Sequence, residues 1–266
     1  MRKLAVCLCL AALLYEPATA NRDLKAQRIV AYLDRVHIPK KSYVVDVKFG
    51  AFVNGAKRGE TLVRIYARRS PTPEGFDFLF RCLEPPQERA KVVLKKGKKI
   101  WFYDSRALRP VQISAQQAVL GHAWIFDALE VRFAESYTAE IEKEELIFDA
   151  ERRQRQSICL KLVAKNGATT MPPLLYTWVD KTNYHQIKRE VYALSGKLLR
   201  ISFFTAFKDT LGEPGPTRAI VIDRMRPDFI LVIDFSGFSY RDLPEHWFRE
   251  EFMPHVVQQL KATGIH

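Results

Sequence analysis

The chain has 266 residues, 47% of them hydrophobic, and is therefore long enough for one large domain with a substantial core. Its 42 basic and 30 acidic residues give a net charge of +12, which in a cytosolic protein would favour a nucleic-acid partner. The N-terminal segment excludes that interpretation, because it is typical of a secreted protein. An anionic membrane surface, an acidic partner or a solvated basic surface without a partner then remain as explanations of the charge.

The N-terminal segment predicts a secretory signal peptide over residues 1–20. Arg2 and Lys3 form a basic tip, an apolar run of about a dozen residues follows, and Ala18 and Ala20 form the A-x-A cleavage pattern. The alternative is an N-terminal membrane anchor, but the run is short for a span of roughly twenty residues. Neither Cys7 nor Cys9 follows an apolar stretch long enough for a lipoprotein signal. We therefore expect a mature chain over residues 21–266 that is periplasmic, soluble and not lipid-anchored.

The first part of the mature chain predicts one helix followed by a series of strands. Residues 21–37 carry apolar side chains at helical spacing, which predicts an amphipathic helix that ends before Pro39. Asn54-Gly55 is a hairpin turn pattern between the first two predicted strands. The predicted strands are Tyr43–Val53, Thr61–Arg69, Phe76–Leu83, Arg89–Leu94, Lys99–Tyr103 and Val111–Ser114.

Residues 115–148 interrupt this series. Gln116–Leu120 and Phe126–Leu129 predict a turn or a short helix, and the acidic patch Glu140–Glu145 is also expected to be helical. The strands resume at Gln156–Lys165, where apolar residues alternate with others.

The region from Leu174 to Phe207 predicts three consecutive antiparallel strands. A polar turn separates the first from the second, and Ser195-Gly196 provides a tight turn between the second and the third. In the middle strand Arg189 shares its face with Ile187 and Val191, so one face is more apolar than the other.

The C-terminal part predicts two more strands and a helix. The strands are Ala219–Met225 and Phe229–Phe235, and the helix is Pro244–Leu260, in which Pro254 should introduce a bend. About ten strands with a helix at each end predict a mainly β, α+β fold. We expect a strongly curved antiparallel sheet that wraps around the N- and C-terminal helices in a single domain.

The sequence contains no recognisable catalytic or metal-binding motif. The six histidines form no close metal-binding pair, and the nucleophile-elbow, phosphate-loop and dinucleotide patterns are absent. We expect no enzyme, no metal and no cofactor. Cys82 and Cys159 are the two cysteines of the predicted mature chain, and they form either one disulfide or two buried thiols.

The predicted sheet carries many aromatic residues. Several strands, such as Ile100–Tyr103 and Ile201–Phe204, are apolar on both faces. For a single residue, core packing is the usual explanation. Taken together, a sheet lined with aromatics under helices is what a pocket for lipid or acyl chains needs. The candidate wall residues of such a cavity are Phe80, Trp101, Tyr103, Phe126, Trp178 and Phe203.

Three segments resemble the outer-membrane lipoprotein-sorting protein family, in the superfamily of LolA/LolB-like periplasmic lipoprotein carriers. The first runs from Trp178-Val179-Asp180-Lys181 through Lys188, Glu190 and Tyr192 to Ser195-Gly196-Lys197. The second is the hairpin from Gly97-Lys98-Lys99-Ile100-Trp101-Phe102-Tyr103 to Leu108–Ser114, and the third is Gln116–Gly121 with Asp127. The resemblance implies an unclosed antiparallel β-barrel, or half-barrel, that encloses helices and an apolar cavity.

The resemblance also implies a function in outer-membrane biogenesis. It implies a periplasmic chaperone-like carrier that binds lipid or lipoprotein acyl chains, with an inner-membrane transporter as donor and an outer-membrane acceptor. The alternative is an envelope module that binds a protein partner on the same fold, using the basic surface. A lipid hydrolase ranks last, since the sequence offers no evident pair of nucleophile and base.

Overall fold

The computed structural model of the chain describes residues 18–70, 75–97, 99–113, 132–165 and 172–262. In these residues thirteen antiparallel strands form one sheet, in the order β6-β5-β4-β3-β2-β1-β13-β12-β11-β10-β9-β8-β7. The strands are β1 Tyr43–Val53, β2 Ala56–Arg69, β3 Phe76–Glu84, β4 Lys91–Lys96, β5 Lys99–Asp104, β6 Val111–Ile113, β7 Tyr137–Phe148, β8 Gln154–Ala164, β9 Leu174–Asp180, β10 Gln186–Tyr192, β11 Leu198–Thr210, β12 Glu213–Asp223 and β13 Phe229–Tyr240.

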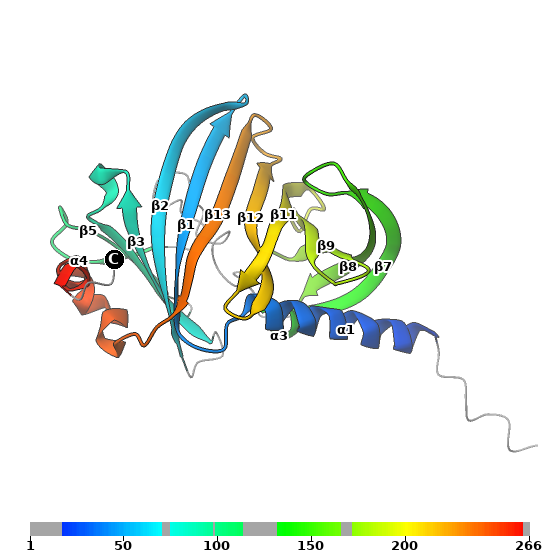
Figure 1. Cartoon of the computed structure of the whole chain (residues 1–266), viewed down its shortest axis with the longest axis horizontal. Coiled ribbons are helices and arrows are strands. Elements are labelled where there is room, and N and C mark those ends of the chain that lie inside the picture. Colours follow the sequence, from blue (N-terminus) through cyan, green and yellow to red (C-terminus); the bar gives the residue numbers. More distant parts are fainter. Residues whose placement is uncertain (1–17, 71–74, 98, 114–131, 166–171, 263–266) are drawn as a thin grey trace, which may run out of the picture.

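The sheet consists of two meanders, β1–β6 and β7–β13, in which neighbours in sequence are neighbours in space. They are joined where β1 pairs with β13, from Tyr43 opposite Tyr240 to Val53 opposite Phe229. β6 and β7 are the two edges, so the sheet curves without closing (Figure 1). The predicted fold class, a curved and unclosed antiparallel sheet with few helices, is therefore confirmed.

Short polar turns set the register of several hairpins. Asn54 and Gly55 link β1 to β2 with φ values of 50° and 75°, the left-handed values of a two-residue hairpin turn. The three strands expected between Leu174 and Phe207 are present as β9, β10 and β11. The acidic patch Glu140–Glu145 is a correction: it lies in β7, where Tyr137, Ala139 and Ile141 alternate inward and charged residues point outward.

The two faces of the sheet are covered by different helices. We call the face covered by α1 the α1 face, and the face covered by the C-terminal helix α4 the α4 face. Helix α1 (Ala18–His37) packs Ala26, Ile29, Val30 and Leu33 against β7, β8 and β9, and we call this group the α1 core. The short helix α3 (Phe133–Ser136) adds Phe133 to it. On the same face of the sheet, side chains from β1–β5, β12 and β13 form the central core. It includes Phe49, Phe78, Phe80 and Ile233.

The C-terminal segment packs on the opposite face from α1. The 3₁₀ turns η2 (Glu245–Phe248) and η3 (Glu250–Phe252) and helix α4 (Met253–Ala262) cover Tyr66, Leu79 and Leu94. This group is the α4 core, and Trp247 and Phe248 are its largest C-terminal side chains. The predicted bent helix over residues 244–260 is wrong, because this segment is divided into η2, η3 and α4. Pro254 is the second residue of α4, where its missing N–H costs no helical hydrogen bond and causes no bend.

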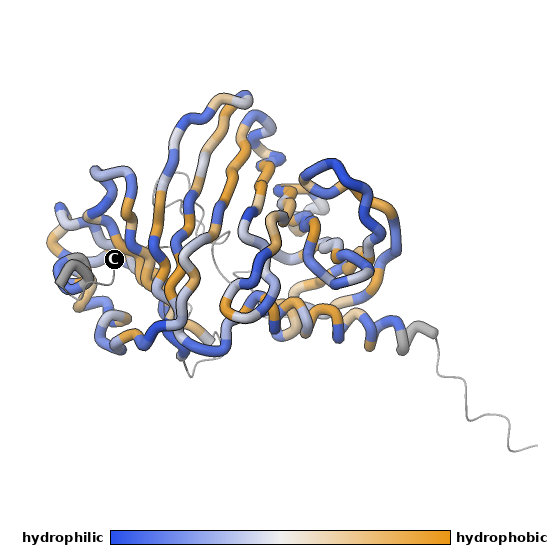
Figure 2. The backbone as a smooth tube through the Cα atoms, viewed as in Figure 1, coloured by the Kyte–Doolittle hydropathy of each residue, from blue (hydrophilic) through white to orange (hydrophobic). Residues whose placement is uncertain are grey.

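Hydropathy follows this double coverage. In β3, every residue from Phe76 to Cys82 is buried. One face is apolar and belongs to the central core, whereas the other carries Leu79 of the α4 core between the buried charged residues Asp77 and Arg81. The strands at the centre of the sheet are correspondingly hydrophobic along much of their length, whereas the β7–β8 hairpin is largely hydrophilic (Figure 2). A 3₁₀ turn, η1 (Pro86–Glu88), separates β3 from β4.

Of the two alternatives left open for Cys82 and Cys159, the structure has the second, because both are buried free thiols. Cys82 is in β3 and Cys159 is in β8, so they belong to different meanders of the sheet. Burial raises the pKa of the Cys82 thiol to about 11 and that of Cys159 to about 12, so both are protonated at neutral pH.

Candidate functional site

A cavity of about 290 Å³ lies on the α1 face, between the central core and the α1 core. Most of its wall is apolar, and it is entered beside the end of α1. The apolar side chains that line it are Val36, Ile38, Pro39, Tyr43, Val45, Ile65, Phe133, Phe204, Leu211, Pro216, Phe235, Phe238 and Tyr240. The polar and charged side chains are Arg35, His37, Lys40, Gln186, Arg189, Thr210 and Glu213.

The β11–β12 turn forms one side of the cavity entrance. Leu211 and Gly212 have φ values of 62° and 88°, and the left-handed conformation is rare for leucine. The strained turn is held because the Leu211 side chain packs on the central core and Tyr240 Oη donates a hydrogen bond to the Leu211 carbonyl at 3.1 Å. The turn thereby places Leu211 and Gly212 in the cavity wall.

The residues after α1 form the other side of the entrance. Lys40 Nζ lies 4.0 Å from Glu213 Oε1, so one ion pair spans the entrance from the end of α1 to the β11–β12 turn. Lys40 is 77% exposed, and such a pair contributes at most about 1 kcal/mol. The two sides of the entrance are therefore held only weakly by charge.

Arg189, on β10, brings a positive charge into the cavity wall. Its Cζ lies 4.8 Å from the ring centre of Phe133 and 5.1 Å from that of Phe204. Its Nη2 donates to Gln186 Oε1 at 3.0 Å, and Gln186 Nε2 in turn donates to Thr177 Oγ1 at 2.6 Å. Gln186 and Thr177 are fully buried, so this chain of bonds and the two aromatic rings orient the guanidinium.

His37, the last residue of α1, lines the same cavity beside Arg189. The pKa of His37 is lowered to about 4, mainly by burial and also by the positive charge of Arg189 and the proximity of His185. His37 is therefore neutral at pH 7.

Asp34 fixes the short helix that supplies Phe133. One Asp34 carboxylate oxygen accepts the backbone N–H of Phe133 and the other accepts that of Ala134, each at 2.8 Å. Burial raises the pKa of Asp34, although these two N–H groups and Arg132 oppose the increase. Asp34 thus caps α3 from a different helix, and it holds the Phe133 ring at the cavity wall.

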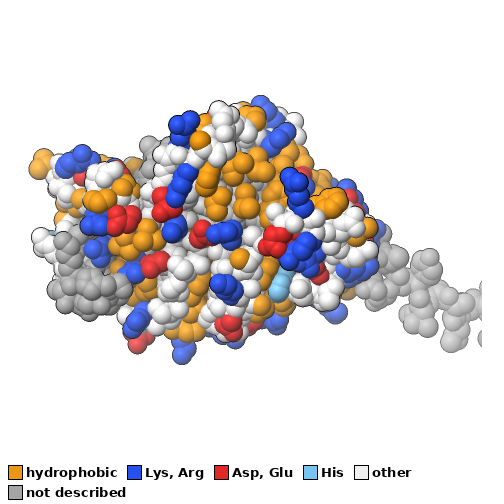
Figure 3. Space-filling model, turned by 45° about the horizontal axis from the view of Figure 1, so that its top comes forward, with side chains coloured by type: hydrophobic (Ala, Val, Ile, Leu, Met, Phe, Trp, Pro, Cys, Tyr) orange, Lys and Arg blue, Asp and Glu red, His pale blue; other side chains and the backbone are white. Residues whose placement is uncertain are grey.

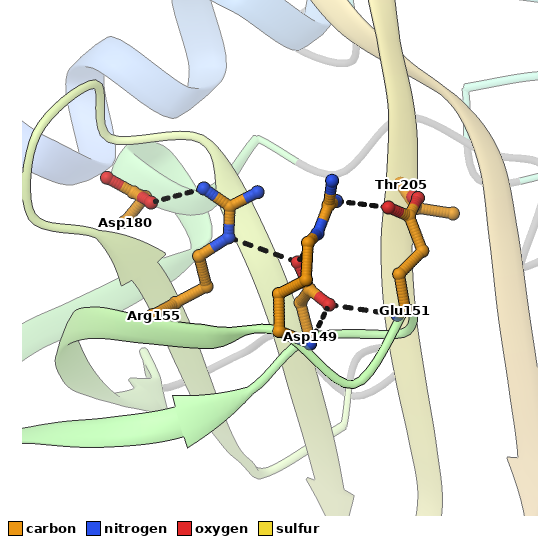
Figure 4. Close-up of polar contacts among 6 residues, drawn as sticks. Asp149, Glu151, Arg155, Asp180 and Thr205 are labelled. Carbon is orange, nitrogen blue, oxygen red and sulfur yellow. Dashed lines mark hydrogen bonds and ion pairs between the residues drawn. The ribbon is translucent and has the colours of Figure 1, made fainter.

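A second, more polar cavity of about 340 Å³ lies next to the first and shares Phe204 with it. Its charged residues are already paired, as Figure 4 shows. Arg155 Nε donates to Asp149 at 3.0 Å and its Nη1 lies 3.6 Å from Asp180, while Thr205 Oγ1 donates to Glu151 at 2.5 Å. These contacts fasten the β7–β8 turn to β9 and β11, and we interpret this cluster as structural.

Five of the six predicted wall residues are described, and none of the five lines the 290 Å³ cavity. Phe80 is buried in the central core, and Trp101 and Tyr103 belong to the α4 core. Trp178 and Phe203 are on the α4 face: Trp178 Nε1 donates to Glu145 at 2.7 Å, and Phe203 is opposite Ile220. Phe126 lies outside the described residues. The structure thus places the five described residues on two faces of the sheet and not in one shared wall.

One of the cavity residues that the prediction missed is the sequence neighbour of a residue that it named, and the other described ones lie elsewhere in the chain. Phe204 was missed in favour of Phe203, because β11 is apolar on both faces from Ile201 to Phe204 and alternation gives no direction there. Alternation with Val191 placed Arg189 on the more apolar face of β10. A charged residue on an apolar face is unusual, and this was the signal in the sequence that could have indicated a site there. His37 and Leu211 lie at element ends, where sequence patterns carry little information.

Other kinds of site are not found in the described part of the chain. It contains no group of three or more His, Cys, Asp or Glu side chains placed to hold a metal ion. None of its helices combines the length and the apolar character that crossing a membrane requires.

Comparison with solved structures identifies the same fold in three proteins, each with a TM-score of 0.72. A LolA superfamily protein from Nitrosomonas europaea is 25% identical, and the match covers 85% of this chain and 98% of that one. A DUF1329 family protein from Desulfovibrio piger is 16% identical, with 87% and 99% covered. A putative outer-membrane lipoprotein-sorting protein domain from Vibrio parahaemolyticus is 15% identical, with the same coverage. None of these three names is that of an enzyme.

A family model described only as an uncharacterized protein matches residues 75–255, which is more than half of the chain. No curated protein matches it. The chain belongs to the family matched over residues 75–255, and its fold is that of the LolA superfamily protein from Nitrosomonas europaea.

Proposed function

We propose that the protein is a soluble periplasmic carrier that binds an acyl chain of a lipid or lipoprotein in the cavity on the α1 face, for transport towards the outer membrane. The observation that carries this proposal is the cavity itself, whose apolar wall lies between two cores and opens beside the end of α1. The N-terminal sequence supports export, because it has the basic tip, apolar run and A-x-A pattern of a signal peptide.

The size of the cavity limits the cargo. At about 290 Å³ it is at the lower end of the range of roughly 300–1,000 Å³ usual for small-molecule sites. Transfer of an acyl chain into it would be driven by about 0.8 kcal/mol for each buried methylene. We therefore propose one acyl chain per cavity.

The first experiment is native mass spectrometry of the protein purified from a periplasm, followed by solvent extraction and lipid analysis. We expect a bound lipid or acylated peptide, and its mass would identify the cargo. Two adjacent residues of β11 provide a matched pair of variants. Phe204→Ser changes the cavity wall and should reduce the bound fraction, whereas Phe203→Ser changes the α4 face and should leave it unchanged. Equal loss in both variants would contradict the assignment of the cavity.

A second candidate function, a module that binds a protein partner of the envelope, is favoured by a different observation. On the α4 face of β11, β12 and β13, no described helix covers a strip of partly exposed apolar residues. The register aligns them in two rows across the strands: Phe203, Ile220 and Val232, and Ile201, Ile222 and Ile230. Figure 3 shows hydrophobic side chains gathered over the middle of one face, with Lys and Arg at its sides.

Such a strip fits the apolar surface of a protein partner. The same pair of variants separates the two candidates. If the protein is a partner-binding module, Phe203→Ser should abolish capture of a defined envelope protein and Phe204→Ser should not. Copurifying lipid that is lost only in Phe204→Ser would favour the carrier.

A further inference from the structure

We infer that the protein docks on the surface of a bilayer that contains anionic phospholipids, through three neighbouring hairpin turns at one end of the sheet. The turns are residues 54–58, 193–197 and 224–228, and we call them the turn rim. This docking surface is independent of the cavity, so it does not require the carrier function proposed above.

The three turns lie side by side because the hairpins that they close are neighbours in the sheet. β13 pairs with both β1 and β12, and β12 pairs with β11. The backbone N–H of Asn54 donates to the Asp228 carbonyl at 2.9 Å, and that of Arg224 donates to the Leu199 carbonyl at 2.9 Å. Figure 1 shows the β1–β2 and β12–β13 turns next to each other at the top. The turn rim is therefore one continuous edge.

The turn rim and the cavity entrance are at opposite ends of β11. This strand has 13 residues, which at about 3.3 Å per residue places the β10–β11 turn roughly 40 Å from the β11–β12 turn. Leu211 and Gly212 of the β11–β12 turn line the cavity, and no residue of the turn rim does. Docking through the turn rim thus leaves the entrance facing away from the bilayer.

Two large apolar side chains stand at the tips of the turn rim. Leu194 is 92% exposed and Met225 is 53% exposed, and neither belongs to one of the three cores. Backbone hydrogen bonds order both turns: the Gly196 N–H donates to the Ala193 carbonyl at 2.9 Å, and Asp223 Oδ1 accepts the Met225 N–H at 2.8 Å. Turns of this kind do not need an apolar side chain. Leu194 and Met225 are therefore held outside the core, where they can enter an apolar phase beyond the protein.

Basic residues accompany the apolar tips. The turn rim contains one acidic residue, Asp228, and five basic residues, all of them exposed: Lys57, Arg58, Lys197, Arg224 and Arg226. Glu60 and Asp223 adjoin the turns, so this end carries five basic residues against three acidic ones when they are included. Lys and Arg side chains lie along this end in Figure 3, where it comes forward. A positive end of this kind is attracted by the negative surface potential of an anionic bilayer.

The arrangement fits a bilayer better than it fits a protein partner. A protein interface gathers its apolar side chains in a core that a polar rim encloses. Leu194 and Met225 stand instead on separate turns, two strand spacings or roughly 10 Å apart. Separate tips can each enter the boundary between head groups and acyl chains, while the Lys and Arg side chains between them stay at the level of the phosphates.

The test is co-sedimentation of the purified protein with lipid vesicles, from which the dissociation constant is obtained. Vesicles of phosphatidylethanolamine and phosphatidylglycerol are anionic, and vesicles of phosphatidylcholine are the neutral comparison. We expect binding to the anionic vesicles, weak binding to the neutral ones, and a decrease in affinity at high salt because the cations are exposed.

Two sets of substitutions separate the apolar and the charged contributions. Leu194→Ser combined with Met225→Ser should weaken binding to anionic vesicles by about tenfold or more, because it removes two side chains that the bilayer buries. Arg58→Gln, Lys197→Gln and Arg224→Gln should each weaken it by about fivefold. Circular dichroism should show the same thermal unfolding as for the wild-type protein, since all five side chains are exposed.

Matched controls change the same kinds of residue elsewhere on the surface. Leu24→Ser combined with Leu146→Ser replaces two apolar side chains that are each 56% exposed, on α1 and β7. Lys41→Gln, Lys208→Gln and Arg241→Gln together remove three exposed charges near the opposite ends of the strands. Both control variants should bind anionic vesicles nearly as the wild-type protein does.

Several outcomes would overturn the docking surface. Equal binding to anionic and neutral vesicles would do so, and so would control variants that lose as much affinity as the turn-rim variants. Turn-rim variants that keep their vesicle affinity but lose capture of a defined envelope protein would make the turn rim a protein interface instead. The carrier function is tested separately: Phe204→Ser should bind vesicles as the wild-type protein does, and the turn-rim variants should keep any copurifying lipid.

Discussion

The two meanders of the sheet are covered in different ways. The β3–β5 strands, with Val44 of β1 and Tyr66 of β2, are packed on both faces, by the central core on one side and by the α4 core on the other. The β7–β10 strands are packed mainly on one face, against α1, and their other face carries charged and aromatic side chains such as Lys188, Glu190 and Tyr176. The first region is built like the interior of a protein, and the second like a half-exposed antiparallel sheet.

This difference in packing indicates where a ligand can enter. A region that is packed on both faces cannot open without exposing a large buried area. In the other region α1 covers one face only, so less buried area is lost when α1 moves. The 290 Å³ cavity lies where the two regions meet, and it is lined by the end of α1, the β11–β12 turn and the edge of the central core. We therefore expect stability to depend mostly on the doubly covered region and binding to depend mostly on the junction.

The largest effect on stability should come from the α4 core. Trp247 is 1% exposed and packs edge-to-face on Tyr66, with ring centres 5.9 Å apart. Trp247→Ala should lower the free energy of unfolding by about 3–5 kcal/mol, through lost burial and the cavity left behind. Urea unfolding followed by circular dichroism measures this, with the partly exposed Trp101→Ala as the comparison. Equal losses in the two variants would contradict the dominant role of the α4 segment.

A smaller effect should come from the protonation of His37. Its pKa is 6.5 when unfolded and about 4 when folded, so between these pH values the unfolded state binds more protons. Stability should therefore fall as the pH falls from 6.5 to about 4, by up to about 3 kcal/mol, and stay level below that for this group.

The measurement is urea unfolding of the wild-type protein and of His37→Gln across this pH range. The difference between the two pH profiles isolates His37 from the other groups that titrate. If the two profiles are parallel, the buried neutral state of His37 is wrong.

The capping of α3 by Asp34 should contribute less to the free energy of unfolding than the protonation of His37 does. Asp34→Ala removes the acceptors of the Phe133 and Ala134 N–H groups and should cost about 1–2 kcal/mol. Asp34→Asn keeps one acceptor oxygen and should cost less. Because Phe133 lines the cavity, the affinity for an acyl probe should fall in the same order. An Asp34→Ala variant that is destabilised but keeps full affinity would show that α3 does not shape the site.

The smallest effect should come from the ion pair across the entrance. Lys40→Ala breaks the 4.0 Å contact with Glu213 and should change the free energy of unfolding by less than about 1 kcal/mol. Since the contact is exposed, the small change should decrease further at high salt. A larger loss that persists in high salt would mean that the entrance is held more firmly than the geometry indicates.

Sequence patterns predicted much of the fold. Alternation and turn residues located β9, β10 and β11, and Asn54-Gly55 located the β1–β2 turn. The predicted N-terminal helix ends at His37, as α1 does. Two predictions from the sequence were wrong. In β7 the run of charged residues was interpreted as a helix, although its alternation is that of a strand. Pro254 was treated as an interior residue of a helix that in fact begins at Met253.

The site was much less predictable than the fold. Trp178 and Phe203 are aromatic and lie in the predicted strands, but their parity directs them to the α4 face. Their neighbours Thr177 and Phe204 occupy the α1 face. In strands that are apolar on both faces, composition cannot tell which face will be covered by a helix, because both choices bury hydrophobic area.

The sequence by itself determined the class of fold, a long antiparallel meander with an amphipathic helix before it, and it predicts an export signal at the N-terminus. Each of these is a local pattern, because turns, alternation and helical periodicity depend on residues close together in the chain. Only the tertiary structure decided that α1 and α4 cover opposite faces and that β1 pairs with β13. It also brought His37, Arg189 and Leu211 to one cavity, since these contacts join residues far apart in sequence.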